Sequence, residues 1–397
     1  MKRIRVAIVD DSSFVRKALS RMLGTIPELI VVGAASSGEE LLAHLAQWEP
    51  DLVTLDLGMP GMGGLATLDR ILAWRPIPVI VLSGTSSREA LLAVEALQRG
   101  TVDFIDKQRF SLVDFEALRP ALTERIFALA GPSAPPSVVE AAEPIRPPSA
   151  PRAASSEFDA VVMGASTGGP LALQLVLEAL PPVLSAPVFI AQHMPEGFTE
   201  PFATRLDGRL PFRVRESEHA SWAEPGAVYV ARAGVHLRLR REGARTMLLH
   251  SSTPADLPHK PSVDELFESA RQCFGARCIA VLLTGMGRDG ARGLASLAAA
   301  GAHTIGQDER SCVVYGMPGA ARALGAVREE LPLDEIGPRI AALLGRARNV
   351  AGAGALTGTR SCPPCRGASR ACSLATRPTR CSPSVDTARR RRWSSPR

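Results

Sequence analysis

The stretch VVMGASTGGP at residues 161–170 decides the expected architecture of the chain. Apolar residues from Ala160 to Met163 predict a buried strand, and the small residues that follow turn the chain into the helical pattern LALQLVLEAL. Ser166 then lies on a strand-to-helix turn, beside helical N–H groups that have no partner in the helix. A nucleophile and an oxyanion site can share such a turn. A simple tight turn or a phosphate-binding loop of Rossmann type would also need glycines there.

Length and charge limit the possible classes of protein. The chain has 397 residues and a formal net charge of +6, which is enough length for two or three domains. Ten arginines and one aspartate fall in residues 350–397, so the rest of the chain carries a formal charge of about −3. The body therefore lacks the basic signature of a specific nucleic-acid binder.

Cysteine usage and hydropathy point to a cytoplasmic protein. The chain has no apolar run long enough to cross a bilayer and no signal-peptide pattern, so we expect no membrane insertion. Of the seven cysteines, four lie near the end of the chain in C-x₂-C-x₆-C-x₈-C spacing, at Cys362, Cys365, Cys372 and Cys381. That spacing lacks a second close pair or histidines, so it predicts neither a zinc site nor a disulfide framework. We interpret residues 349–397 as a disordered basic tail.

Residues 1–130 predict an α/β domain with a doubly wound parallel sheet. Strands are expected at residues 4–9, 29–34, 52–56, 79–83 and 103–106, with helical patterns between them. Polar residues end these strands and should meet at one edge of the sheet, namely Asp10, Asp11, Asp56, Ser83 and Lys107. Three converging carboxylates suit Mg²⁺, and a lysine with a hydroxyl can steady a phosphoryl group on Asp56. Taken singly, each acid could be only a helix cap or a loop residue.

Residues 1–125 resemble the receiver domain of two-component response regulators, which has a flavodoxin-like fold. The resemblance implies that Asp56 is phosphorylated and that Asp10, Asp11 and Asp56 hold Mg²⁺, with help from the carbonyl of Gly58. Ser83 and Lys107 would respond to the phosphate, and Phe104 would be the aromatic residue coupled to it. The chain departs from the family pattern at Gln108, where proline is common, and at Gly63, where aspartate is common.

Residues 131–156 contain seven prolines and no helical or strand periodicity. Such a segment cannot bury enough apolar surface to fold alone. We expect it to be a tether between the receiver domain and a second domain over residues 157–348.

The second domain is predicted to be another doubly wound α/β domain, with a mainly parallel sheet and three polar residues at strand ends. The strand PVFIAQH ends on His193, and the strand IAVLL leads through a glycine-rich turn to Asp289 at the start of a helix. Together with Ser166 they could form a nucleophile, a base and a group that orients the base. Separately, the histidine could be a surface or core residue, and the aspartate a charge at a helix N-terminus.

Other segments of this domain have clear patterns. MPEGFTEPFATRL predicts a helix with Pro195 near its start, and Ser262 with Glu265 predicts a capping box at the head of the next helix. Between them FRVRES, AVYVA, HLRLRRE and TMLLHS alternate polar and apolar residues, which predicts an antiparallel insertion at the sheet edge.

The motifs GASTGGP, QHMPEGFT, HKPSVDELF, LLTGMGRDGARGL and YGMPGAA, in this order after a receiver, closely resemble chemotaxis protein-glutamate methylesterases of the CheB family. The order Ser, His, Asp also argues against α/β-hydrolases, which run Ser, acid, His. The resemblance covers roughly residues 1–348 and implies the triad Ser166, His193 and Asp289, with the backbone around Thr167 and Met286 stabilising the oxyanion.

The resemblance also implies a substrate, a phosphodonor and a mode of regulation. The enzyme would hydrolyse glutamate γ-methyl esters on methyl-accepting chemotaxis receptors and deamidate selected glutamines, with no cofactor for the esterase reaction. A chemotaxis histidine kinase would phosphorylate the receiver, and the unphosphorylated receiver would cover the esterase groove.

Two other readings of the residues stay open at this stage. One is a receiver joined to a different serine hydrolase that acts on a small ester. The other is a receiver with a nucleotide-binding module, although Gly164–Gly169 lacks the G-x-G-x-x-G spacing.

Overall fold

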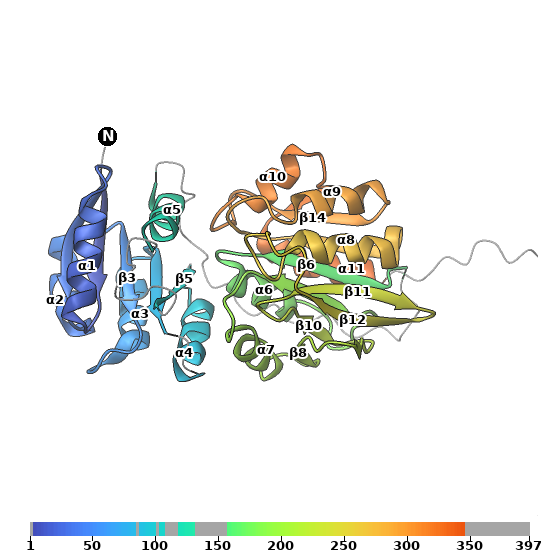
Figure 1. The fold of residues 1–397 in the computed structure, drawn as a ribbon, viewed down its shortest axis with the longest axis horizontal. Helices are drawn as coiled ribbons and strands as arrows, with labels where there is room; N and C mark the ends of the chain where they lie inside the picture. The colour runs from blue at the N-terminus through green and yellow to red at the C-terminus, as the bar shows by residue number, and fades with distance from the viewer. Residues whose placement is uncertain (1–2, 85–86, 101–102, 108–117, 132–156, 346–397) are drawn as a thin grey trace, which may run out of the picture. The chain divides into compact units, whose positions relative to one another are not determined.

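The computed structural model describes residues 3–84, 87–100, 103–107, 118–131 and 157–345 (Figure 1). The described residues all belong to one compact unit within residues 1–349. The predictions for Gln108, for most of the tether and for the four late cysteines lie outside the described residues.

The N-terminal part of the chain forms a five-stranded parallel sheet with the strand order β2-β1-β3-β4-β5. This confirms the doubly wound sheet predicted from the alternating pattern. The strands are β1 (Ile4–Val9), β2 (Leu29–Ala35), β3 (Leu52–Asp56), β4 (Val79–Ser83) and β5 (Asp103–Asp106).

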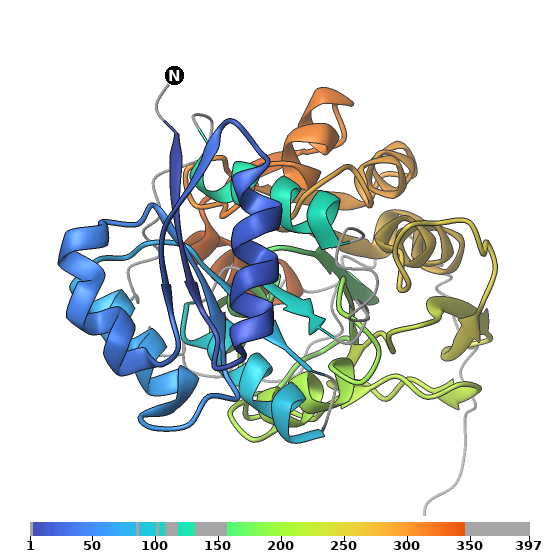
Figure 2. The ribbon, with the colours of Figure 1, turned by 60° about the vertical axis from the view of Figure 1, so that its left-hand side comes forward.

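Helices cover both faces of this sheet. Helices α1 (Ser13–Gly24) and α5 (Leu118–Ala130) share an apolar cluster with β1 on one face, as Figure 2 shows for the blue and teal helices. Helices α2 (Gly38–Trp48), α3 (Gly63–Trp74) and α4 (Ser87–Gln98) pack on the other face. The side-chain hydroxyls of Ser12 and Ser37 cap α1 and α2, which places the first turns of both helices.

A seven-stranded parallel sheet organises residues 157–345, in the order β15-β14-β13-β6-β7-β10-β8. Strand β6 lies between β13 and β7, so the chain segments that follow these three strands start from neighbouring positions on one sheet edge. The strands are β6 (Ala160–Ala165), β7 (Val188–Gln192), β8 (Val214–Glu216), β10 (Val228–Val230), β13 (Cys278–Leu282), β14 (His303–Gln307) and β15 (Glu329–Leu331).

The prediction of an antiparallel insertion is right for only part of its segment. Strands β11 (His236–Glu242) and β12 (Arg245–Ser251) are antiparallel, and β12 continues to β9 (Ser221–Trp222). The segments FRVRES and AVYVA instead supply β8 and β10, which pair in parallel at the edge of the main sheet. Short alternating segments do not encode strand direction, because direction depends on the connection and on the neighbouring strand.

Two sets of helices enclose the second sheet. Helices α6 (Gly169–Glu178), α7 (Thr199–Asp207) and α11 (Leu333–Leu344) pack on one face. Helices α8 (Val263–Phe274), α9 (Ala291–Ala299) and α10 (Met317–Ala323) cover the other. None of the helices in the described ranges has the length and apolar character needed to cross a bilayer.

Helix α7 begins later than predicted. The sequence pattern placed its start near Pro195, whereas the helix starts at Thr199. Gly197 has a φ of 86°, which an α-helix does not accommodate. The residues between β7 and α7 therefore form a turn at the mouth of the site described below.

Gly164 near the end of β6 packs closely against Val263 at the start of α8, so we expect substitutions at these two positions to have non-additive effects on stability. A Cβ atom on Gly164 would lie 2.2 Å from Cγ1 of Val263, so Gly164→Ala should destabilise the protein by about 1–3 kcal/mol. Val263→Ala removes the obstructing methyl groups, so the double variant should lose less stability than the sum of the single variants.

Chemical denaturation of the four proteins measures this coupling, with Gly208→Ala as the matched control. A Cβ on Gly208 would meet only backbone atoms at 3.8 Å, an ordinary contact. Strict additivity of the two substitutions would contradict the proposed clash.

Candidate active site and phosphoacceptor site

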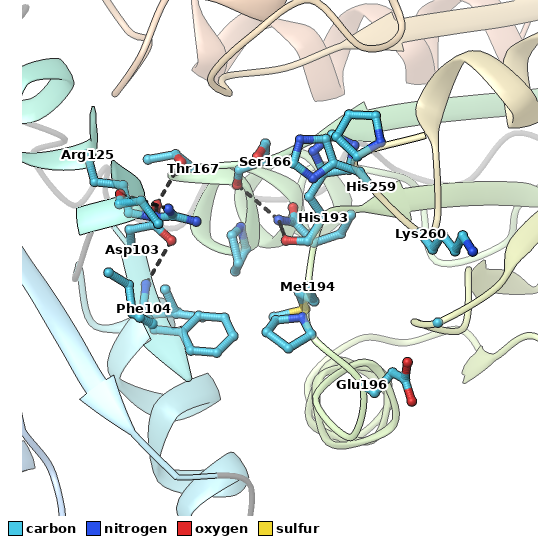
Figure 3. Close-up of a pocket in the computed structure, with 18 of the residues that line it drawn as sticks. Asp103, Phe104, Arg125, Ser166, Thr167, His193, Met194, Glu196, His259 and Lys260 are labelled. Atoms are coloured by element: carbon cyan, nitrogen blue, oxygen red, sulfur yellow. Dashed lines mark hydrogen bonds and ion pairs between the residues drawn. The ribbon is translucent and has the colours of Figure 1, made fainter. Parts of the chain in front are cut away.

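A cavity of about 470 Å³ lies over the ends of β6 and β7. Ser166, Thr167 and His193 line one wall, and Asp103 and Phe104 of the receiver line another (Figure 3). Residues that the sequence analysis assigned to two different domains therefore share one cavity.

The turn that carries Ser166 is held on several sides. The backbone N–H of Ser166 donates to the carbonyl of Thr284 at 3.0 Å, and the carbonyl of Ser166 accepts from Gly169 N–H at 2.8 Å. Gly168 caps α6 with a φ of 77°, a conformation that favours glycine. A Cβ on Gly285 would lie 2.7 Å from Cβ of Ser166, so the glycine-rich turn after β13 fits directly against the serine.

His193 follows β7 and lies next to the serine turn. Its backbone N–H donates to the carbonyl of Ala165 at 3.0 Å, and its side chain is 6% exposed. Nε2 lies 2.8 Å from Oδ2 of Asp289. Nδ1 is buried and has no hydrogen-bond partner among the described residues. The ring therefore offers Nδ1 as its unoccupied nitrogen, while Nε2 donates to the carboxylate.

Asp289 is held mainly by the start of helix α8, and Gly290 N–H, at the cap of the helix that follows in the chain, also donates to Oδ1 at 3.0 Å. Oδ1 accepts from the hydroxyl of Ser262 at 2.9 Å and the N–H of Asp264 at 3.0 Å, and Oδ2 accepts from the N–H of Val263 at 2.7 Å. Helix α9 begins two residues later, at Ala291. The predicted position of Asp289 at the start of the following helix is therefore right, and the carboxylate also lies at the N-terminus of α8.

These contacts keep Asp289 ionised. Burial alone would raise the pKa of the Asp289 carboxyl, but the hydrogen bond and charge of His193, with the N–H groups of Asp264 and Val263, hold the pKa well below its usual range. Ser262 also caps α8 by accepting from Glu265 N–H, which confirms the first half of the predicted capping box. The Glu265 carboxylate pairs instead with Arg238.

Gln192 is a site residue that the sequence analysis missed. Its Nε2 donates to the carbonyls of Ser166 at 2.9 Å and His193 at 3.1 Å, so one buried amide ties the two turns together. Its place just before His193 at a strand end is the only sequence signal, and buried amides at such places are common.

The two residues predicted near the oxyanion site lie in different surroundings. Thr167 is 5% exposed and lines the cavity, and its hydroxyl donates to Oδ2 of Asp103 at 2.8 Å. Met286 is half-buried and follows Gly285, the glycine that packs on Ser166, but its own side chain does not line the cavity.

The predicted carboxylates of the first sheet do converge. One oxygen from each of Asp10, Asp11 and Asp56 lies within 4.8 Å of the others, a grouping that suits a metal ion. Lys107 Nζ lies 2.6 Å from Asp10 and 2.8 Å from Asp56. Burial would lower the pKa of Lys107, but the two carboxylates raise it above its ordinary value. The Gly58 N–H donates to Asp56 Oδ1 at 3.0 Å.

The other two receiver residues lie on the neighbouring strands. Ser83 ends β4 with its side chain buried, and its hydroxyl donates to backbone carbonyls of Gly84 and Glu89. Phe104 on β5 packs against Phe198, just before α7, with ring centroids 4.5 Å apart and the ring planes tilted by 36°. The aromatic residue expected to couple to the phosphate therefore contacts the second sheet's helical layer.

Charged groups accompany this aromatic contact. Arg125 of α5 lies 2.8 Å from the same Asp103 oxygen that accepts from Thr167. Arg205 of α7 reaches α4, with a hydrogen bond to Gln98 and an ion pair to Glu95 at 3.5 Å. Helix α4 also packs against α6 and α7.

Two family models match the chain in separate regions. The model described as "Response regulator receiver domain" matches residues 6–117, and the model described as "CheB methylesterase" matches residues 161–340. The matches contain Asp56 in the first region and Ser166, His193 and Asp289 in the second.

Curated proteins from several bacteria are similar over most of the chain. A protein of Anaeromyxobacter dehalogenans named "Protein-glutamate methylesterase/protein-glutamine glutaminase 4" is 42% identical over 353 residues, which is 87% of this chain and 96% of that protein. A similarly named Geobacillus kaustophilus protein is 40% identical over 87% of this chain and 100% of its own length. A crystal structure of the Thermotoga maritima CheB methylesterase catalytic domain is 34% identical, covers 47% of this chain and 98% of that one, and has a TM-score of 0.46.

Gln192→Leu should slow reaction of Ser166 with a serine-directed phosphonate about tenfold or more, because small displacements of reacting groups carry large rate penalties. The two carbonyls that now accept from Gln192 would no longer hold the serine and histidine turns in register. Gln174→Leu is the control, since it changes a buried glutamine of α6 whose one hydrogen bond among the described residues is to Glu178, at 2.8 Å. Equal labelling rates for the two variants would show that Gln192 has no positioning role.

Proposed function

The chain belongs to the CheB family of protein-glutamate methylesterases with an N-terminal receiver domain, and we propose that Ser166, His193 and Asp289 carry out its hydrolytic reaction. The protein is a receiver-regulated hydrolase of chemotaxis-type two-component signalling. One observation carries the assignment of residues. His193 and Asp289 pair at 2.8 Å, Nδ1 of the histidine has no partner among the described residues, and His193 lines the same cavity as Ser166.

In the proposed mechanism Ser166 Oγ attacks the carbonyl carbon of a glutamate γ-methyl ester. His193 Nδ1 takes the hydroxyl proton and then gives it to the departing methoxy group, which leaves as methanol. A water molecule, deprotonated by the same nitrogen, attacks the acyl-enzyme and releases a glutamate carboxylate and free Ser166. Asp289 fixes the tautomer of His193 and offsets the positive charge that forms on the ring. No metal or organic cofactor takes part in this scheme.

Deamidation uses the same steps with a different leaving group. The tetrahedral intermediate from a glutamine side chain would expel ammonia after His193 protonates the amide nitrogen. The names of the related proteins include this glutaminase activity. We propose it here because the cavity, the nucleophile and the base serve both carbonyl substrates equally.

We propose that backbone N–H groups at Thr167 and Met286 stabilise the oxyanion. Thr167 follows the nucleophile at the start of α6, where helical N–H groups are free to bind an anion. Met286 follows Gly285, whose Cα is close enough to Ser166 that a Cβ atom would collide with it. The Ser166 N–H is already bonded to Thr284, so it is not a donor for this purpose.

We propose that Asp56 accepts the phosphoryl group and that Asp10, Asp11 and Asp56 hold Mg²⁺. The three carboxylates fit a hard cation, and the ion would neutralise phosphate charge during transfer. Burial raises the pKa of Asp10, although the charge and the hydrogen bond of Lys107 act to lower it. Ser83 and Lys107 would contact the phosphate on Asp56.

We propose that the docked receiver inhibits the enzyme and that phosphate on Asp56 releases it. Support comes from Asp103 and Phe104, which occupy the wall of the cavity opposite Ser166 and contact Thr167 and Phe198. Raising an open fraction from 1% to 99% requires about 5.5 kcal/mol of differential stabilisation. One exposed ion pair contributes less than this, so several of these contacts must change together.

We propose methyl-accepting chemotaxis receptors as the substrates and a chemotaxis histidine kinase as the phosphodonor. The support is family membership together with an open cavity large enough for one glutamyl side chain of a larger protein. Phosphoryl transfer from such a kinase takes place in the cytoplasm, which is therefore the proposed site of action.

Ser166→Ala should reduce methanol release from methylated receptors by a factor of 10³ or more, because loss of any triad member removes most of the catalysis. The variant should keep the melting temperature of the parent, since the replaced hydroxyl is only half-buried. Gas-phase detection of labelled methanol measures the rate. Ser185→Ala, a serine remote from the cavity, should retain the parent rate.

Near-normal methanol release by Ser166→Ala would contradict the triad. Hydrolysis of small esters by the parent protein, with no release from methylated receptors, would instead favour a small-ester hydrolase.

Asp103→Asn should raise methanol release in the absence of a phosphodonor about tenfold. Hydrogen bonds to charged groups contribute about 1.5–3 kcal/mol, and Asp103 accepts such bonds from Thr167 and Arg125. The increase should persist in Asp56→Asn/Asp103→Asn, which cannot be phosphorylated. Asp69→Asn is the control, because Asp69 pairs only with Arg99 on the receiver surface. An unchanged basal rate in both Asp103 variants would show that this contact does not restrain the enzyme.

A further inference from the structure

His259 lies against the proposed base and has no role in the mechanism above. It belongs to the segment between β12 and α8, in the motif HKPSVDELF. Its ring is stacked on the ring of His193, with centroids 4.0 Å apart and planes inclined by 15°. In Figure 3 the His193 ring lies between Ser166 and His259, so His259 covers the side of the base that faces away from the nucleophile.

The segment that carries His259 is fixed on both sides of the residue. The Lys260 carbonyl accepts from Gly234 N–H at 3.1 Å. His236, a buried side chain, donates from Nε2 to the carbonyl of Pro254 at 2.9 Å and accepts at Nδ1 from Ser262 N–H at 3.2 Å. His259 is thus held over His193 by backbone contacts, although its outer edge is exposed.

The stacked pair favours a neutral His259. Partial burial, followed by the neighbouring His193, lowers the pKa of His259 to about 4. The charged groups around the pair are Asp289 beyond the edge of His193, Arg125 of α5, and Glu196 and Lys260 at the cavity wall. At neutral pH the ring of His259 is therefore uncharged.

We propose that His259 is a positioning residue for the general base. Its flat contact keeps the His193 ring in the orientation that places Nε2 on Asp289 and leaves Nδ1 open to Ser166. When His193 takes the serine proton, the neutral aromatic face of His259 lies against the new cation, which is a favourable arrangement. The inference rests on the proposed triad and adds a fourth side chain to it.

The proposal differs from a role for His259 in binding substrate or transferring protons. A positioning role needs a flat, neutral, aromatic ring, which phenylalanine also supplies. A role through the ring nitrogens needs histidine itself. Substitution at this one position can therefore separate the two.

Phosphorylated full-length protein is the appropriate material, with methanol release from methylated receptor membranes measured over a range of pH. His259→Ala should lower kcat about tenfold to a hundredfold, with KM little changed, because the base loses its support. His259→Phe should recover most of that loss. His259→Arg should move the acidic limb of the kcat/KM profile down by about one pH unit, because a fixed cation disfavours protonation of His193.

His219→Arg is the matched control for charge. His219 is an exposed histidine of the same catalytic region, does not line the cavity, and should leave the acidic limb where it is in the parent. An acidic limb in His259→Arg that coincides with the parent would overturn the proposal. So would a failure of phenylalanine to recover the rate lost in alanine, since that result assigns the function to the ring nitrogens.

Failure of the His259 proposal can be distinguished from failure of the proposed esterase function. Methanol release by the parent and its loss in Ser166→Ala establish the esterase and its nucleophile. The His259 variants then test only how the base is held.

Discussion

The carboxylate of Asp289 is the contact on which the rest of the site depends. It accepts from the first N–H groups of α8 and from Ser262, and it bonds Nε2 of His193 at 2.8 Å. Helix α8 packs on the sheet and on β11, so the carboxylate is positioned by the core rather than by its own loop. A helix N-terminus supplies both hydrogen bonds and positive potential. The acid therefore stays ionised although it is mostly buried, and the tautomer of His193 follows from it.

The nitrogen used by each partner distinguishes this triad from the arrangement in which the acid contacts Nδ1. Here Nε2 contacts the acid, and Nδ1, the nitrogen nearer the backbone, has no hydrogen-bond partner among the described residues. A base that works through Nδ1 has less freedom to swing, because that nitrogen lies one bond from Cγ. The position of the His193 backbone then matters more, which explains why Gln192 joins the carbonyls of Ser166 and His193. The position of the proposed base nitrogen thus depends on the backbone geometry at the end of β7.

The strand-end residues of both sheets were predictable because parallel strands bring their carboxyl ends to one edge. From the hydropathy pattern and the order of elements along the chain, that rule predicts that Asp56 lies near Asp10 and that His193 lies near Asp289. It does not give the direction of edge strands such as β8 and β10, which depends on long connections. Nor could it find His259, because its contact depends on the path of a segment held by distant residues. Nor could it show that the N-terminus of α8 also holds Asp289, because those contacts join residues that are distant in the chain.

The docked receiver opposes the reaction through charge as well as through occupancy. The oxyanion of the proposed intermediate would form beside Thr167, and the hydroxyl of Thr167 now donates to a carboxylate of Asp103 at 2.8 Å. A negative group so close disfavours further negative charge there, even for a substrate small enough to enter. Arg125 offsets part of that charge, but it is bonded to the same Asp103 oxygen and moves with the receiver. Undocking would remove the blocking side chains and the unfavourable charge together, so one movement of the receiver changes both access to Ser166 and the stability of the intermediate formed on it.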